Sequence, residues 1–345
     1  MLMSPRRDFA SFPASFPRVA SVSVDLDSVD CYWRIHALPG QPPESLRATI
    51  LRRCLPRFAE LFAGLGIRST LFVVGRDVLE DAEGRGLLAS LAGAGHELAN
   101  HSHSHHYDFV RRPAGTIVSE IEHAHAAIGD CAGRAPVGFR APGYETTAAV
   151  MARLCERGYR YDSSAFPSVP YYAAKAVAMA AMRLRGRTSG SILGSPRALA
   201  APSMPYRPAS DDPYARGDLP IWELPLAVTP VLRLPVIGTS VVMAPAWARR
   251  RLVAAVLDAP FVNLELHGID LADAAGDGFP GELVARQPDL RHGLAAKRAA
   301  LEATLLQIRA AGFAFQPLGE VATELERLAR APVGLTDAPA PGGTG

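Results

Sequence analysis

The 345-residue sequence predicts an α/β fold built around a parallel sheet. Short apolar runs typical of strands alternate with longer segments whose apolar residues recur at helical spacing. This order of strand and then helix repeats between residues 18 and 157, as expected of a parallel sheet rather than a helical bundle. Reactive side chains follow directly after several of these strands, where parallel α/β folds build their sites.

The elements are predicted in chain order from these two patterns. The first strand, residues 18–25, ends as V-A-S-V-S-V-D, a strict alternation that finishes on an acid. Further strands are predicted at 68–74, 96–100, 137–140, 221–229 and 261–266. Helices are predicted at 46–65, 80–94, 116–128, 146–157 and 293–311, and Gly95 and Gly158 end two of them.

One domain is expected to span residues 18–330. An N-terminal extension, 1–17, precedes it, and a Pro/Gly/Ala-rich tail, 331–345, is expected to be disordered. The alternation breaks at about 168–220, which predicts an insertion with one helix near 173–184 and a long loop. No apolar run of signal-peptide or membrane-spanning length is present, so we expect a cytoplasmic protein.

Composition excludes two classes of function. The formal net charge is +2 and no long Lys/Arg run concentrates it, which argues against a nucleic-acid partner. Four cysteines lack C-x-x-C spacing, so neither a disulfide framework nor a cysteine zinc site is expected. Composition says nothing about the oligomeric state.

The segment G-H-E-L-A-N-H-S-H-S-H-H predicts a metal site. His101 and His105 are four residues apart, and on one helical turn both imidazoles would reach the same ion. Asp27, just after the first strand, is the candidate third ligand, and Asp25 alternates with it by two, so that both can face one site. The alternative is a solvated turn of histidines. His103 and His106 are expected to be outside the metal's direct ligands or to face solvent.

The motifs resemble those of the polysaccharide deacetylases, also called the NodB-homology or carbohydrate esterase 4 family, from about Val19 to Leu328. Five strings carry the likeness in order: S-V-D-L-D with Asp25 and Asp27, His101-Ser102-His103-Ser104-His105, Arg140-Ala141-Pro142, Tyr161-Asp162-Ser163-Ser164, and Leu264-Glu265-Leu266-His267. Leu26 separates two acids that are adjacent in the family's usual first motif. That spacing is similar to the branch with the lipid-linked aminoarabinose deformylase and the cyclic-imide hydrolases.

The resemblance implies a distorted (β/α)7-type barrel and a role for each matched residue. Asp25 would be the general base, Arg140 its partner, His267 the general acid and Asp162 the residue that tunes this acid. Asp27, His101 and His105 would bind one divalent metal, with Zn²⁺ expected and Co²⁺, Ni²⁺ or Mn²⁺ as alternatives. A backbone N–H near Pro142, Gly143 and Tyr144 would stabilise the oxyanion. The D-x-D spacing leaves open whether Asp25 and Asp27 exchange roles.

Each of these residues also has a structural explanation. Asp162 could cap a loop, Arg140 could form a surface ion pair, and His267 could be a core histidine with its hydrogen bonds satisfied. Residues 171–187 form an apolar stretch followed by arginines, which favours peripheral contact with the inner face of a membrane or, equally, packing on the barrel.

The expected function is hydrolysis of the acetyl or formyl amide of an amino sugar, in a glycan or a lipid-linked saccharide, rather than of a peptide bond. Two alternatives remain: hydrolysis of a cyclic imide or allantoin-like amide, and a catalytically inactive barrel that binds glycans.

Overall fold

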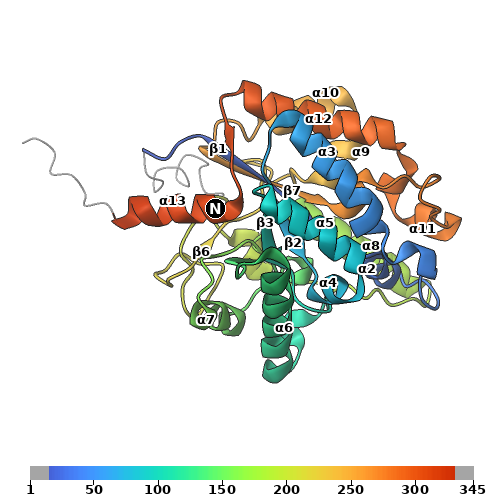
Figure 1. The fold of residues 1–345 in the computed structure, drawn as a ribbon, viewed down its shortest axis with the longest axis horizontal. Helices are drawn as coiled ribbons and strands as arrows, with labels where there is room; N and C mark the ends of the chain where they lie inside the picture. Colours follow the sequence, from blue (N-terminus) through green and yellow to red (C-terminus); the bar gives the residue numbers. More distant parts are fainter. Residues whose placement is uncertain (1–14, 331–345) are drawn as a thin grey trace, which may run out of the picture.

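The computed structural model describes residues 15–330, and a curled parallel sheet covered by helices forms its centre (Figure 1). Every pair of named strands is parallel, in the order β6-β5-β4-β3-β2-β1-β7, and β8 also pairs with β1. The strands are β1 (Val19–Asp25), β2 (Thr70–Val73), β3 (Glu97–Asn100), β4 (Gly138–Phe139), β5 (Tyr161–Asp162), β6 (Trp222–Glu223), β7 (Phe261–His267) and β8 (Ala314–Phe315). The predicted α/β class is confirmed, with a sheet that curls into a distorted barrel.

Strand β1 lies inside the sheet, and all seven of its residues are buried. Val22 and Val24 point into the main hydrophobic core. Ser23 and Asp25 alternate with them, so they face the opposite side, where the functional site lies. In the parallel register with β7, Asp25 pairs with His267, which brings the ends of both strands to one edge of the sheet.

The barrel closes through irregular backbone rather than through a continuous ladder. The edge strands β6 and β7 are bridged by the segment that follows β6, where the Ala227 N–H donates to the carbonyl of Asn263 at 3.0 Å. The Asn263 side-chain amide donates to the Leu224 carbonyl at 2.9 Å. These two bonds satisfy polar groups that an open sheet edge would otherwise leave unpaired.

The helices surround this sheet. They are α2 (Val29–Ile35), α3 (Leu55–Leu65), α4 (Gly75–Glu80), α5 (Ala82–Gly93), α6 (Ala114–Ala132), α7 (Ala148–Arg157), α8 (Val169–Leu184), α9 (Gly238–Met243), α10 (Ala246–Ala254), α11 (Gly281–Arg286), α12 (Leu294–Ala310) and α13 (Leu318–Arg330). The sequence did not predict α2, α4, α9, α10, α11 or α13. The helix predicted at 80–94 is broken at Asp81, whose carboxylate accepts the N–H of Gly84 and so begins α5.

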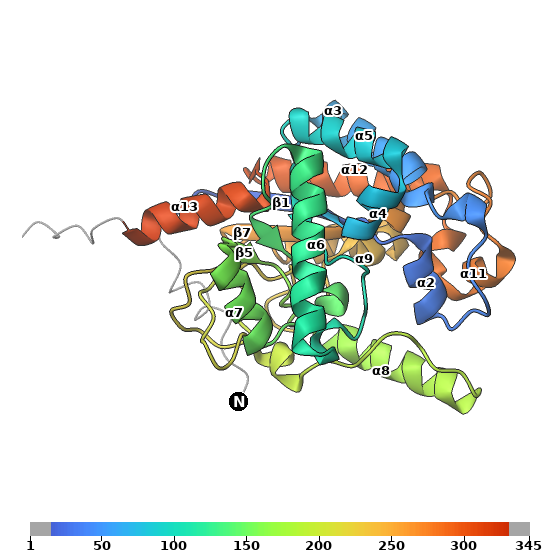
Figure 2. The same cartoon turned by 60° about the horizontal axis from the view of Figure 1, so that its bottom comes forward.

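The predicted helix near 173–184 is present as α8 and begins earlier, because the Ser168 hydroxyl accepts the Tyr171 N–H at 3.3 Å and caps its first turn. Figure 2 shows α8 at the lower edge of the molecule, away from α3, α5 and α12. Between residues 15 and 330, no helix combines the length and the apolar character needed to cross a membrane. The expected tail, 331–345, and most of the extension lie outside the described residues.

Candidate active site

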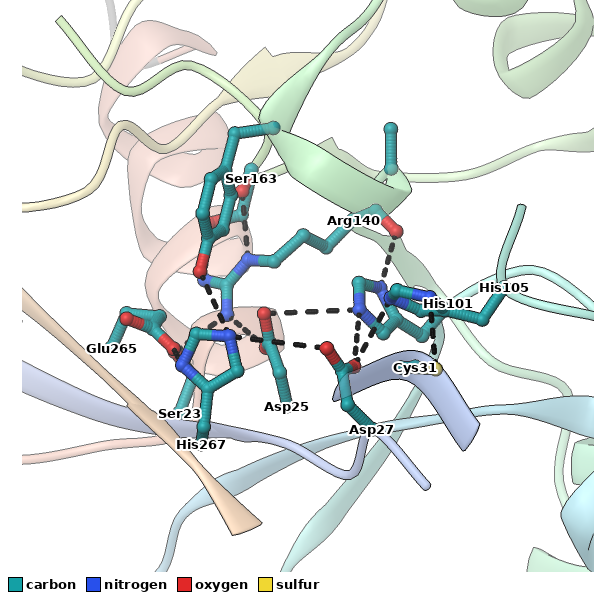
Figure 3. A network of polar contacts seen from close by, with 12 residues as sticks. Ser23, Asp25, Asp27, Cys31, His101, His105, Arg140, Ser163, Glu265 and His267 are labelled. Carbon is teal, nitrogen blue, oxygen red and sulfur yellow. Dashed lines mark hydrogen bonds and ion pairs between the residues drawn. The ribbon is translucent and has the colours of Figure 1, made fainter. Parts of the chain in front are cut away.

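The loops after β1, β3, β4 and β7 bring the predicted metal ligands, base and acid together (Figure 3). Because neighbouring parallel strands end at the same edge, side chains that are far apart in the sequence meet there. Asp25, Asp27, His101, His105 and His267 all line one cavity of about 420 Å³.

Asp27, His101 and His105 form the candidate metal centre. Oδ1 of Asp27 lies 3.2 Å from Nε2 of His101 and 3.1 Å from Nε2 of His105, and all three side chains are buried. Burial acts to raise the pKa of Asp27, but the two imidazoles hold it well below its usual value. The Asp27 charge in turn raises the pKa of His105 well above 6.5, against the effect of burial. The two pKa shifts thus describe an ionised carboxylate paired with imidazoles.

The three side chains fit a divalent ion. Bonds of about 2.0–2.1 Å in a tetrahedral site put ligand atoms roughly 3.3 Å apart, close to the two separations seen here. Oδ1 of Asp27 is buried and accepts no well-directed hydrogen bond within the described residues. His101 donates from Nδ1 to the Arg140 carbonyl at 2.7 Å, which fixes its Nε2 toward Asp27.

The loop that carries the two histidines differs from the helical turn that we expected. Residues 101–105 are irregular, and Ser102 and His105 adopt left-handed backbone angles, with φ of 61° and 49°. The Glu120 carboxylate accepts the N–H groups of residues 103–104, at 3.1 and 2.7 Å. The two imidazoles converge because the Glu120 carboxylate anchors this loop. The prediction that His101 and His105 share a helical face was therefore wrong, although the loop does bring the two side chains together.

Asp25 and Arg140 form a fully buried ion pair. Nη1 of Arg140 donates to Oδ1 of Asp25 at 2.5 Å and to the Ser23 hydroxyl at 3.0 Å. Its other guanidinium nitrogens donate to the carbonyl and the hydroxyl of Ser163, at 2.8 and 2.9 Å. The guanidinium also lies 4.0 Å from the centre of the Phe72 ring. Arg140 is therefore no surface residue, and it fixes the orientation of the Asp25 carboxylate.

His267 lies at the end of β7, paired with Glu265 rather than with Asp162. Its Nδ1 lies 2.8 Å from Oε1 of Glu265, and the hydroxyl of Tyr144 lies 3.3 Å from its Nε2. Burial acts to lower the pKa of His267, but Glu265, Asp27 and Asp25 together outweigh it and raise this pKa well above 6.5. The imidazole is thus held in the protonated form that a general acid needs.

Asp162, which we expected beside His267, is engaged elsewhere. Its Oδ1 accepts a hydrogen bond from the Ser164 hydroxyl at 2.7 Å, and it lies beside the buried carboxyl of Glu223. Burial raises the pKa of Asp162 to about 6, and burial together with the Asp162 charge raises that of Glu223 well above 4.5. The expected contact is therefore corrected: this pair supports the sheet next to the site.

The Pro142-Gly143-Tyr144 segment forms a tight turn at the cavity. Gly143 and Tyr144 both have left-handed backbone angles, with φ of 72° and 65°, and the Tyr144 N–H donates to the Ala141 carbonyl at 3.1 Å. That N–H is therefore already used, which removes it as a candidate oxyanion donor. The turn instead directs the Tyr144 hydroxyl at His267.

Several side chains of the candidate site were not predicted from the sequence. Glu265 lies inside the string that supplied His267, two residues earlier, so strand alternation places both on one face. That spacing was a signal that could have identified it. Cys31 lies against His105, and α8 supplies one wall of the cavity; no pattern linked these segments to the site. The cavity wall is mainly apolar and aromatic: Tyr32, Ile35, Tyr107, Tyr171, Ala174, Ala178, Met179, Met182 and Ile237.

Residues 46–161 match the sequence pattern of the polysaccharide deacetylase family. A peptidoglycan deacetylase of Helicobacter pylori is 24% identical over 160 residues, which are 45% of this chain and 52% of that protein. The chain thus matches about half the length of this curated relative.

Two solved structures share the fold over nearly the whole chain. A polysaccharide deacetylase from Mycobacterium smegmatis aligns with a TM-score of 0.61 and 19% identity, covering 98% of this chain and 99% of the other. The PuuE allantoinase aligns with a TM-score of 0.58 and 16% identity, covering 94% and 97%. At these identities the likeness describes the fold alone.

Proposed function

We propose that this protein is a metal-dependent hydrolase that removes the acetyl or formyl group from the nitrogen of an amino sugar. The observation that carries the proposal is the arrangement in one cavity of three converging candidate metal ligands, a buried carboxylate and a histidine paired with a buried glutamate. Amide hydrolysis needs these parts: an activated water, a group to take its proton and a group to protonate the leaving nitrogen.

Asp27, His101 and His105 would hold one divalent ion, with Zn²⁺ expected and Co²⁺, Ni²⁺ or Mn²⁺ as alternatives. When bound, such an ion polarises the acyl carbonyl and lowers the pKa of a water molecule. Asp25 takes the proton of the attacking water, and its ion pair with Arg140 orients this carboxylate.

His267 delivers a proton from Nε2 to the departing nitrogen, because Glu265 occupies its Nδ1 and stabilises the imidazolium. The Tyr144 hydroxyl, 3.3 Å from Nε2, lies where it can hold this ring toward the substrate. Base and acid thus lie next to each other, at the paired ends of β1 and β7.

Acyl release from a panel of N-acetyl and N-formyl amino sugars tests this proposal. The purified protein is stripped with a chelator and reloaded with Zn²⁺ or Co²⁺, and acetate or formate is measured. We expect metal-dependent release that the His101→Ala variant loses together with the bound metal. Ring opening of allantoin or a cyclic imide without acyl release would overturn it, as would metal-independent sugar binding without turnover.

We further propose that the substrate is a saccharide linked to a lipid, bound at a membrane surface. The cavity wall on α8 is apolar, through Ala178, Met179 and Met182. On the same helix Val177 and Leu184 are 70% and 90% exposed, and Arg183 and Arg185 lie beside them. An exposed apolar surface next to cations is typical of peripheral contact with anionic lipid.

Flotation with vesicles of phosphatidylglycerol and phosphatidylcholine measures this contact. We expect the protein to float at low salt and the double variant Val177→Glu, Leu184→Glu to remain at the bottom, because apolar contact with lipid is lost and two negative charges offset the nearby arginines. Leu79→Glu is the matched control, since Leu79 is 59% exposed on α4 rather than on α8. A wild-type protein that stays at the bottom would contradict the membrane proposal and leave the hydrolase proposal intact.

A further inference from the structure

The metal ligand His105 contacts a buried cysteine on its far side. Nδ1 of His105 lies 3.2 Å from the Sγ atom of Cys31, and Cys31 is fully buried. The opposite nitrogen, Nε2, lies 3.1 Å from the Asp27 carboxylate. The imidazole is therefore held between the metal centre and a thiol (Figure 3).

The orientation of this ring fixes which nitrogen carries the proton. A histidine that binds a cation through Nε2 must present a lone pair there, so its proton lies on Nδ1. At His105 the group that receives this proton is the sulfur of Cys31. His101 meets a different acceptor, because its Nδ1 donates to a backbone carbonyl.

Arg34 forms hydrogen bonds with both Cys31 and His105. Its Nη2 donates to Sγ of Cys31 at 3.4 Å and to the backbone carbonyl of His105 at 3.1 Å. Because His105 has a left-handed φ of 49°, its conformation depends on such anchors. Cys31 and Arg34 both belong to α2, so this helix supports the candidate ligand His105 on the side away from Asp27.

We propose that Cys31 is a positioning residue for His105: its sulfur accepts the Nδ1 proton, sets the tautomer and aims Nε2 at the metal. This inference rests on the metal site proposed above. Residues that accept from the outer nitrogen of a ligand histidine change metal affinity by about 10–100-fold when they are removed. The thiol acts through its hydrogen bond and contacts no substrate.

Metal affinity of three variants tests the role. Competition with a chromophoric chelator gives the dissociation constant for Zn²⁺ or Co²⁺, and the absorption spectrum of the Co²⁺ form reports the ligand geometry. Cys31→Ala should weaken binding about 10–100-fold and alter this spectrum. Cys31→Ser should restore most of the affinity, since its hydroxyl also accepts a hydrogen bond.

Cys54→Ala is the matched control. Cys54 is also fully buried, but it lies beside Arg57 and Asp277 rather than the metal ligands. Its truncation should lower the melting temperature of the metal-free protein as Cys31→Ala does, and leave metal affinity unchanged. Equal affinities of Cys31→Ala and the wild type, or an equal loss in Cys54→Ala, would overturn the inference. A wild type that binds no metal would instead refute the proposed function.

Discussion

Replacing Asp25 with asparagine is expected to lower kcat by about 10²–10⁴-fold, the range that general-base catalysis contributes. The amide of asparagine keeps the size of the side chain but cannot take a proton from water. The candidate metal ligands Asp27, His101 and His105 remain, so the metal content of the variant should stay at the wild-type level. Acyl release at saturating substrate and metal analysis on the same sample measure both quantities.

The same change should also destabilise the fold. Arg140 is fully buried, and removing one partner of such an ion pair leaves an uncompensated charge, at a cost of about 3–5 kcal/mol in comparable cases. Asparagine can still accept one hydrogen bond, so the loss in free energy of unfolding should lie at or below this range. Urea unfolding of the metal-free protein gives the value.

Ser23→Ala is the control for this variant. It removes another hydrogen bond to the Arg140 guanidinium, at 3.0 Å, and keeps the Asp25 carboxylate. We expect about 1 kcal/mol of destabilisation and less than a tenfold loss of activity. Activity of Asp25→Asn close to the wild-type level would contradict the assignment of Asp25 as the base, and exchanged roles with Asp27 would then have to be considered.

Strand order alone predicted that several side chains of the candidate site lie close together. Asp25, Arg140 and His267 each end or follow a strand, and parallel strands end at one edge, so their convergence needs no further information. The candidate metal ligands were proposed from residue type and spacing. Their geometry could not be predicted, because the conformation of the loop that carries His101 and His105 depends on Glu120, a residue of α6 that is distant in sequence.

The partners of these residues could not be predicted in the same way. The contact of Cys31 with His105 joins residues 74 positions apart, and nothing in either segment indicates it. The role of α8 as a cavity wall depends on how a long insertion folds back over the strand ends. Such contacts are set by tertiary packing, whereas helix periodicity and strand alternation report only which face of an element is buried.

Glu265→Gln is expected to move the alkaline limb of the kcat/KM profile to lower pH. In the wild type Glu265, together with Asp27 and Asp25, raises the pKa of His267 well above 6.5, so the imidazole loses its proton only as the pH rises through that higher pKa. Without the Glu265 charge, burial acts to lower this pKa, and less of the acid is protonated at pH 8. The loss of activity should approach the roughly 10²–10⁴-fold effect of removing a general acid at high pH and shrink as the pH falls toward 6.

Asp162→Asn separates the two carboxylates that could tune His267. Asp162 accepts from Ser164 and lies beside Glu223, so its replacement should leave the alkaline limb in place while it changes stability. If Asp162→Asn shifts the limb and Glu265→Gln does not, the pairing seen in the structure does not operate during catalysis. If only Glu265→Gln shifts the alkaline limb, the pKa of His267 is set by a residue of the same strand. Residues two apart on β7 share one face of the strand, so Glu265 and His267 lie on the same side.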